Sequence, residues 1–372
     1  MIVLPAKTYL LEAYSVRELQ KYGKEIKGRV LPFVYESEKP DYYSLGTLPL
    51  KRLPVKNPDS SHLYFNYSID CELPLNTVYT EDVERRSFFH GSATWEFAEA
   101  SVHGFVAQME GLGVGGGATL FVYPDVARHQ RSLYRGLADA GFEIALHLNG
   151  LRYSRLKSSQ AKWLGEMPYA EQKSALRMAK QDLEDVVSRP VLGYRACYGS
   201  ANDDTFPICE ELGFEWTSNS SHRYRPEFFA CWRGSWPYAH HTNRKCKLVV
   251  GDMPLYEIPV TTGLRIFYDE KIQQPLDLRV ETPPTVLGDK REKFRAVVEE
   301  NLIEMELRSA PVRAVIGASH NTNQFNDPSC HQAQNLDWLV KHARELAAQF
   351  RLDFTPASFR EIVSEARRID AY

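Results

Sequence analysis

The chain has 372 residues, of which 43% are hydrophobic and 25% are charged, and its formal net charge at pH 7 is −3. These values are ordinary for a globular protein, and the small net charge provides no basic field for nucleic acid or an anionic membrane. No window approaches the roughly 20 apolar residues of a membrane span. The N-terminus has no basic start followed by an apolar run, so we expect a cytoplasmic protein without a signal peptide.

The six cysteines are scattered along the chain and include no Cys-x-x-Cys pair. In a cytoplasmic protein such residues are most simply reduced thiols. The spacing therefore argues against a zinc site built from thiolates.

Residues 1–60 come first, and we expect them to form an N-terminal extension to a main domain of residues 61–372. The segment "SVRE" at Ser15–Glu18 is a capping box, which is typical of a helix start. A linker with several prolines follows, and no pattern in the extension points to chemistry. Packing or an interface is the expected role of this segment.

From residue 63 onward, strand-like and helix-like segments alternate. The expected strands are 63–70, 118–124, 142–148, 191–199, 214–220, 255–261, 312–321 and one that begins at 352. The expected helices are 94–113, 126–141, 169–188, 205–213, 291–310, 332–350 and one that starts at Thr355-Pro356. This alternation predicts an α/β fold with a parallel sheet, either open or closed as a barrel.

The first expected strand ends in two carboxylates, Asp70 and Glu72. Residues two apart on a strand lie on the same face, so both acids point one way and Cys71 points the other. An unpaired buried carboxylate is costly. We therefore expect either solvent or a cationic group beside these two side chains.

Other expected strands also end in polar residues, namely His147 and Asn149, Arg195, and His320. The carboxyl ends of parallel strands in an α/β barrel share one face, where active sites are built. One such residue alone is most simply a solvated strand end. Several of them, on strands far apart in sequence, favour a site.

In this order the motifs resemble those of the polysaccharide deacetylase family, also called the nodulation-protein-B homology family, which hydrolyses N-acetyl groups from sugars. The resemblance covers roughly residues 63–360. "SIDCE" (68–72) is similar to the family's T-F-D-D-G motif, and 117–147 resembles the strand and helix that lead to its H-x-x-x-H metal motif. "GYRACYG" (193–199) resembles the R-x-P-Y-G motif, "LYEIPVT" (255–261) the fourth-motif strand, and "GASHNTNQF" (317–325) takes the place of the final histidine motif.

The resemblance implies a distorted (β/α) barrel of about seven parallel strands. It also implies catalytic roles for three residues. Asp70 would be the general base, Arg195 would pair with that base, and His320 would protonate the leaving amine. The backbone N–H of Tyr198 would help to hold the oxyanion, together with a metal ion.

The metal motif departs from the family pattern. Cys71 and Leu151 stand where the family has two of its three metal ligands, and Cys197 stands where proline is usual. Glu72 and His147, with Asp70 nearby, are the remaining candidates for holding a divalent, zinc-like ion. Asn149 is a further candidate, as a neutral oxygen ligand. Because allantoinase-like members of the family work without metal, a site with no cofactor stays open.

The expected activity is hydrolysis of an N-acyl group, most simply N-acetyl, from an amino-sugar substrate. A cytoplasmic location favours a precursor of surface polysaccharide or lipopolysaccharide O-antigen over a finished polymer. Two alternatives remain: a metal-independent, allantoinase-like amidohydrolase acting on a small cyclic amide, and a sugar-binding barrel that has lost catalysis. Trp236 either stacks on a sugar ring or only anchors its loop.

Overall fold

The computed structural model describes residues 61–75, 91–269 and 274–370. The predicted N-terminal extension, with its expected helix at Ser15–Glu18, lies outside the described residues. Among the helices that are described, none is both long and apolar enough to cross a membrane.

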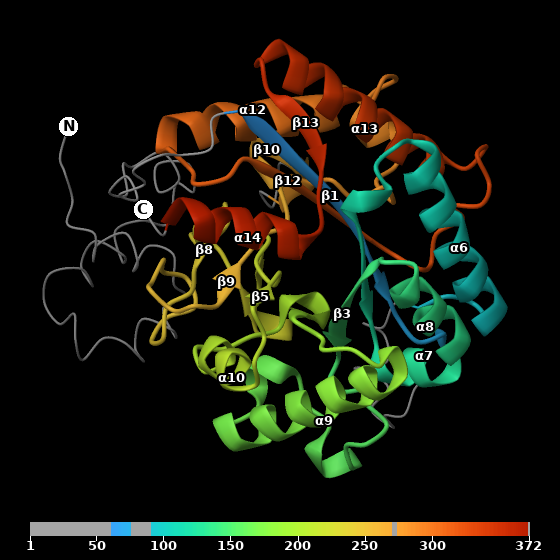
Figure 1. The fold of residues 1–372 in the computed structure, drawn as a ribbon, viewed down its shortest axis with the longest axis vertical. Coiled ribbons are helices and arrows are strands. Elements are labelled where there is room, and N and C mark those ends of the chain that lie inside the picture. Colours follow the sequence, from blue (N-terminus) through green and yellow to red (C-terminus); the bar gives the residue numbers. More distant parts are fainter. Residues whose placement is uncertain (1–60, 76–90, 270–273, 371–372) are drawn as a thin grey trace, which may run out of the picture.

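A curled sheet of nine strands forms the centre of the molecule, with helices arranged around it (Figure 1). The strands follow the order β12-β1-β2-β3-β4-β5-β9-β8, and β13 pairs with the first part of β1. All pairings are parallel except the one between β8 and β9. The strands are β1 (His62–Cys71), β2 (Ala118–Val122), β3 (Glu143–Leu148), β4 (Gly193–Ala196), β5 (Trp216–Thr217), β8 (His240–His241), β9 (Tyr256–Glu257), β12 (Ala314–His320) and β13 (Asp353–Pro356).

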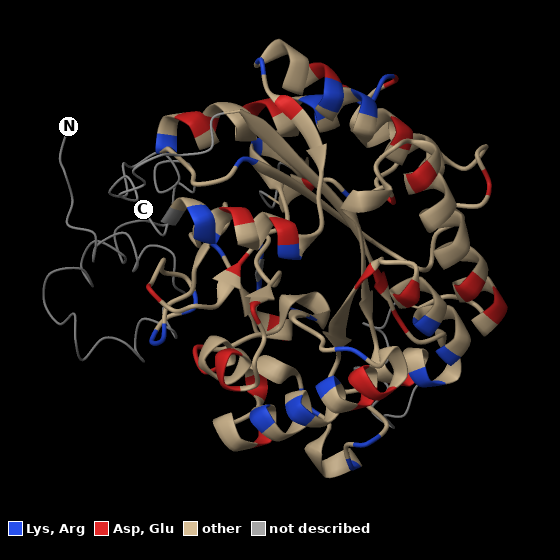
Figure 2. Cartoon of the chain, in the orientation of Figure 1, with Lys and Arg blue, Asp and Glu red and all other residues tan. Residues whose placement is uncertain are grey.

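Nine α-helices are described, and most of them follow the expected segments. They are α6 (Trp95–Gly111), α7 (Pro124–His129), α8 (Arg131–Asp139), α9 (Tyr169–Val187), α10 (Thr205–Glu211), α11 (Pro284–Leu287), α12 (Glu292–Arg308), α13 (His331–Gln349) and α14 (Phe359–Asp370). Figure 2 shows basic and acidic residues of both signs along α9 and α12, as expected for helices with one solvated face.

Two small antiparallel hairpins lie outside the main sheet and were not predicted from the sequence. Their strands are β6 (Tyr224–Arg225) with β7 (Ala230–Cys231), and β10 (Thr262–Asp269) with β11 (Gln274–Asp277). Short 3₁₀ turns complete the described elements: η2 (Gly115–Gly117), η3 (Ser158–Gln160), η4 (Leu164–Glu166), η5 (Cys197–Gly199) and η6 (Pro226–Phe228).

The sheet curls far enough for its two ends to meet. The backbone N–H of Thr261, just after β9, donates to the carbonyl of Ile316 in β12 over 2.9 Å. The Thr261 hydroxyl also accepts from the N–H of Ile316. The predicted α/β fold with a distorted, mostly parallel barrel is therefore confirmed.

Strand β1 shows why the site residues point as they do. Nine of its ten residues are buried, which is typical of a central parallel strand covered on both faces. Its odd-numbered side chains, from Leu63 to Cys71, pack into the larger hydrophobic core. Asp70 and Glu72 belong to the opposite, even-numbered face, as strand alternation predicts.

Two expected helix boundaries were wrong. The single helix expected over 126–141 is broken at Gln130, which separates α7 from α8. The helix expected from Thr355-Pro356 begins only at Phe359, because 353–356 pair with β1 as strand β13. A capping box explains the later start: Ser358 N–H donates to the Glu361 carboxylate, and Glu361 N–H donates to the Ser358 hydroxyl.

Candidate active site

Asp70 at the end of β1 forms a buried ion pair with Arg195 of β4. Arg195 Nη1 donates to Asp70 Oδ1 over 2.8 Å and to Ser68 Oγ over 2.9 Å. Its Nε and Nη2 donate to the carbonyl and the hydroxyl of Ser218, each over 3.0 Å. The guanidinium also lies 3.7 Å from the centre of the Phe121 ring. These contacts fix the guanidinium and so orient the Asp70 carboxylate.

The charge state of Asp70 follows from its neighbours. Burial alone would raise the pKa of this carboxyl group. The positive charge of Arg195 opposes burial, and His147 and His320 contribute in the same direction, so the pKa of Asp70 lies below its usual range. Asp70 is therefore ionised at neutral pH and able to accept a proton.

His320 ends β12, and its Cα is paired with that of Asp70 in the β1–β12 register. Its Nδ1 donates to Glu281 Oε1 over 2.8 Å. Burial would lower the pKa of His320, but the hydrogen bond and the negative charge of Glu281 outweigh it and raise that pKa. Burial opposes ionisation of Glu281 too, yet His320 lowers the pKa of Glu281 to about 2. The pair therefore favours a protonated imidazole facing an ionised carboxylate.

One cavity at the carboxyl ends of the strands is lined by both Asp70 and His320. Its other charged or polar lining residues are Glu72, Arg195, Cys197, Tyr198, Ser218, Asn219, Ser221, Arg223, Arg225, Asp277 and Arg279. We call Asp70, Arg195, His320 and Glu281 the acid–base group. It combines a proton acceptor and a proton donor beside one space.

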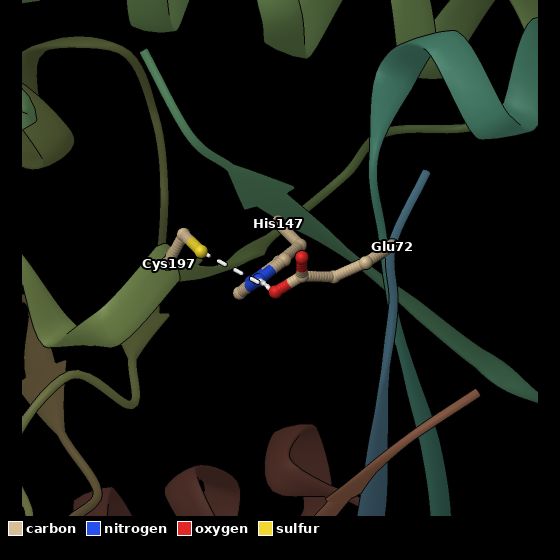
Figure 3. Close-up of side chains that lie close together, drawn as sticks. All are labelled: Glu72, His147 and Cys197. Carbon is tan, nitrogen blue, oxygen red and sulfur yellow. Dashed lines mark hydrogen bonds and ion pairs between the residues drawn. The ribbon is translucent and has the colours of Figure 1, made fainter. Parts of the chain in front are cut away.

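A second cluster lies beside the acid–base group, formed by Glu72, His147 and Cys197 and called the Glu72 cluster below (Figure 3). Glu72 Oε1 lies 3.4 Å from His147 Nε2 and 3.3 Å from Cys197 Sγ. The three possible ligand atoms lie within 4.8 Å of one another, and all three residues are buried. Figure 3 shows the three side chains converging from separate segments of the chain.

The Glu72 cluster fits a divalent cation. His147 Nδ1 lies 3.0 Å from the Arg195 carbonyl, which only accepts hydrogen bonds, so Nδ1 carries the proton. In the neutral ring the lone pair of Nε2 then faces the Glu72 carboxylate, and two acceptors need a proton or a cation between them. Tetrahedral zinc, with bonds of about 2.0–2.3 Å, places its ligand atoms roughly 3.3–3.7 Å apart. The distances from Glu72 to its two neighbours match this spacing.

Glu72 is also held from the side away from His147. Arg152 Nη1 lies 3.5 Å from Glu72 Oε2, and Arg152 Nη2 donates to the carbonyls of Leu73 and Pro74. Burial would raise the pKa of Glu72, but His147, followed by more distant charges and Arg152, lowers it to about 2. Glu72 is therefore a carboxylate, with a permanent guanidinium on one side.

Asn149 does not take the predicted role of oxygen ligand. Its Oδ1 accepts from the backbone N–H of Leu151 over 3.0 Å, which leaves the amide nitrogen facing Cys197 Sγ at 3.5 Å. Asn149 therefore supports the sulfur atom instead of binding a cation through oxygen. Leu151 is buried in the hydrophobic core and offers no replacement for the missing histidine.

Tyr198 follows Cys197 and lines the cavity, as expected. Its φ of 59° is in the left-handed region, which is uncommon for a residue with a side chain. Its ring packs against Trp163 and Phe228, with centroids 5.4 and 4.4 Å away. These aromatic contacts hold the strained turn, and with it the peptide group of Tyr198, at the edge of the cavity.

Trp236 is not brought to the cavity. It is buried beside Tyr238, Met305 and Ala310, with its ring edge-on to Tyr238, and the Arg308 guanidinium lies 5.6 Å from the centre of the indole ring. The ring is enclosed by the surrounding described residues and presents no free face to the cavity. Of the two roles considered, the structure supports anchoring.

Three residues of the site were not expected from the sequence: Cys197 as a ligand, Glu281 and Arg152. Cys197 follows β4 directly, and the register His147↔Arg195 and Leu148↔Ala196 places it beside Asn149. This pairing of the two strands is the feature from which the position of Cys197 could have been inferred. Glu281 follows the unpredicted β10–β11 hairpin, so no sequence pattern pointed to it.

Comparison with known proteins agrees with this arrangement. Residues 114–217 match the family model described as polysaccharide deacetylase. This segment includes His147, Arg195, Cys197 and Tyr198. No curated protein sequence matches the chain.

Solved structures share the fold at low sequence identity. A Mycobacterium smegmatis protein described as a polysaccharide deacetylase is 18% identical, with a TM-score of 0.54, and the match covers 85% of this chain and 94% of that one. The Puue allantoinase matches over the same shares of the two chains, with 13% identity and a TM-score of 0.54. A glycoside hydrolase/deacetylase from Parabacteroides distasonis is 10% identical, with a TM-score of 0.55 and coverage of 85% and 73%.

The matching family model spans the second and third motifs of the sequence, and the fold of the described residues is that of the solved deacetylases. The family supports a deacetylase or amidohydrolase activity. The match to the polysaccharide deacetylase model covers residues 114–217, and the likeness to the solved structures is one of fold.

Proposed function

We propose that the protein hydrolyses the N-acyl group of an amino sugar, most simply an N-acetyl group. The observation that carries the proposal is the acid–base group. An ionised Asp70 paired with Arg195, and a His320 paired with Glu281, line one cavity. Amide hydrolysis needs a base that takes a proton from water and an acid that gives one to the leaving nitrogen.

The proposed reaction assigns one proton transfer to each residue. Asp70 accepts a proton from water as its oxygen attacks the acyl carbon. His320 then donates a proton to the amide nitrogen as the C–N bond breaks, which releases a carboxylic acid and a free amine. Arg195 keeps Asp70 oriented and ionised, and Tyr198, which lines the same cavity, would stabilise the oxyanion through its peptide N–H.

Glu72, His147 and Cys197 would hold a divalent, zinc-like ion. Such an ion polarises a carbonyl group and lowers the pKa of a bound water molecule. His147 is prepared for this role by its hydrogen bond to the Arg195 carbonyl, and Cys197 by the Asn149 amide. The pairing of β3 with β4 places the Arg195 carbonyl beside His147, and this contact would orient the imidazole toward a metal ion.

The finer description of the substrate stays a prediction. An amino-sugar precursor of surface polysaccharide or lipopolysaccharide, acted on in the cytoplasm, rests on the expectations from sequence. The family model supports a carbohydrate substrate in general terms. It does not name the sugar or the acyl group.

One observation favours the metal-independent amidohydrolase as a second candidate. Arg152 already places a positive charge beside Glu72, so the cluster has a cation without any metal ion. In that case the substrate would be a small cyclic amide. A sugar-binding barrel without catalysis is the weaker alternative, because it would have no need for an assembled Asp70–Arg195–His320 set.

Release of carboxylate measures the proposed function directly. Purified protein should release acetate from one or more N-acetylated amino sugars or their nucleotide-linked forms, and a chelator should abolish that release until zinc, cobalt or manganese is restored. Activity on a cyclic ureide that is indifferent to chelator would favour the second candidate. Binding of sugars with no turnover of any amide would contradict both.

A further inference from the structure

The active-site cavity contains more positive charge than its catalytic groups require. Arg195 is paired with Asp70, and His320 with Glu281. Three further arginines line the same cavity: Arg223, Arg225 and Arg279.

One carboxylate, Asp277 at the end of β11, forms ion pairs with two of these three guanidinium groups. It pairs with Arg223, and it accepts from Arg279 Nε over 3.0 Å. Arg225 has no carboxylate within 4 Å in the described part of the chain. Its pKa is lowered, first by burial and then by the positive charge of Arg279. Two positive charges are thus left without a matching carboxylate.

Arg223 has unused hydrogen-bonding capacity. It is 6% exposed, and its Nε and Nη1 find no acceptor among the residues described at 61–75, 91–269 and 274–370. Burial lowers its pKa to about 9, despite the opposing charge of Asp277. Buried donors without an acceptor are costly, and a buried guanidinium is rarely left with donors unmatched. The missing acceptors are most simply supplied by a ligand.

We propose that Arg223, Arg225 and Arg279 bind an oxyanion carried by the substrate, either a phosphate or a carboxylate. The planar guanidinium group matches both through paired N–H donors. The three arginines line the same cavity as Asp70 and His320, so the anion and the acyl nitrogen belong to one molecule. This proposal rests on the proposed function for the identity of the reacting group. It adds that the preferred substrates are charged and that neutral N-acyl sugars are not preferred.

Binding of small anions tests the recognition site without relying on turnover. Titration calorimetry would compare inorganic phosphate, glucuronate and uncharged glucose with the wild-type protein. At least one anion should bind more than tenfold more tightly than glucose and should lose affinity as potassium chloride is added. Stronger binding of phosphate would indicate a phosphorylated sugar, and stronger binding of glucuronate a uronic acid.

Arg225→Gln is the most informative variant, because it removes a guanidinium without leaving a carboxylate unpaired. This variant should bind the preferred anion at least tenfold more weakly than the wild type does. Arg225→Lys keeps the charge but loses the planar donor pair, so its affinity should lie between those of Arg225→Gln and the wild type. Arg177→Gln, at an exposed position of α9, is the matched control and should bind like wild type. Thermal unfolding would verify that each variant is folded.

If neither anion binds more tightly than glucose, or if Arg225→Gln binds the anion as wild type does, the proposal is overturned. Neither result depends on hydrolysis. Conversely, anion binding with no release of acid from any amide would leave the recognition site intact and contradict the proposed function. In an active preparation, kcat/KM should be at least tenfold higher for the charged N-acyl sugar than for its neutral counterpart.

Discussion

The acid–base group and the Glu72 cluster lie side by side, yet they differ in how many of their residues occupy positions of the motifs that the sequence resembles. Asp70, Arg195 and His320 are where the resemblance places them. In the Glu72 cluster, only His147 matches a ligand position of the resembled motifs. The other two candidate ligands are a carboxylate just after β1 and a thiol from the turn after β4. Proton transfer depends on particular groups in a fixed geometry, whereas a cation accepts oxygen, nitrogen or sulfur donors at suitable distances.

The two clusters also differ in how their charges are balanced. Each ionised carboxylate of the acid–base group has its own cationic partner, Arg195 for Asp70 and His320 for Glu281. Glu72 instead has Arg152 Nη1 at 3.5 Å from one oxygen and His147 Nε2 at 3.4 Å from the other. Substitutions in the first cluster should therefore affect chemistry, and substitutions in the second should affect cation binding.

The largest effect is expected for Asp70→Asn. The amide keeps the shape of the side chain but cannot accept a proton, so kcat should fall by about 10³–10⁴-fold. Stopped assays of acetate release would measure this loss. Since the change leaves Arg195 without its counter-ion, thermal unfolding must show a folded variant. Asp185→Asn, at an exposed position on α9, is the control. Near wild-type turnover by folded Asp70→Asn would remove Asp70 from the role of base.

A smaller loss, about 10²-fold, is expected for His320→Ala. The loss should shrink when the leaving amine is made more acidic, because such a group needs less help from a proton donor. Parallel kinetics on an alkyl amide and an activated anilide would show this dependence. His103→Ala, on the exposed side of α6, should behave like wild type on both. An equal loss on the two substrates would argue that His320 is not the acid.

A still smaller effect, well below about 10²-fold at low pH, is expected for Glu281→Gln. Glu281 raises the pKa of His320, so the protonated acid persists to higher pH in the wild type. Without that negative charge the pKa of His320 falls, and activity should decline at lower pH than before. The pH dependence of kcat would report this shift, with Glu110→Gln as a surface control. An unchanged basic limb would show that Glu281 does not tune His320.

The sequence predicted three members of the acid–base group, Asp70, Arg195 and His320, because they lie at the ends of segments with a strong hydrophobic pattern. Asp70 and His320 follow buried strands that pair in register, and alternation along β1 placed Asp70 and Glu72 on one face, opposite Cys71. Such local periodicity depends on the residues of the strand itself, so it is visible before any tertiary contact is known.

The rest of the site depends on contacts between distant segments. Cys197 was considered for its spacing from other cysteines and as the residue that stands where proline is usual. Neither consideration reveals a ligand set that mixes sulfur with nitrogen and oxygen. Glu281 reaches His320 from a segment 39 residues earlier, after a hairpin whose irregular pairing leaves no clear alternation. The sequence could not decide between the two roles considered for Trp236. An aromatic residue near a polar loop packs into a core as readily as it faces a ligand.

Cobalt substitution tests directly whether the Cys197 thiol, with Glu72 and His147, binds a divalent cation. Protein loaded with one equivalent of Co²⁺ should show the near-ultraviolet band of thiolate-to-cobalt charge transfer, together with the visible bands of a four-coordinate ion. Cys197→Ser should lose the charge-transfer band, and Cys330→Ser, at a half-buried cysteine outside the cluster, should keep it. A wild-type protein that binds no cobalt after dialysis, yet retains full activity in chelator, would contradict the account and leave Arg152 as the cation beside Glu72.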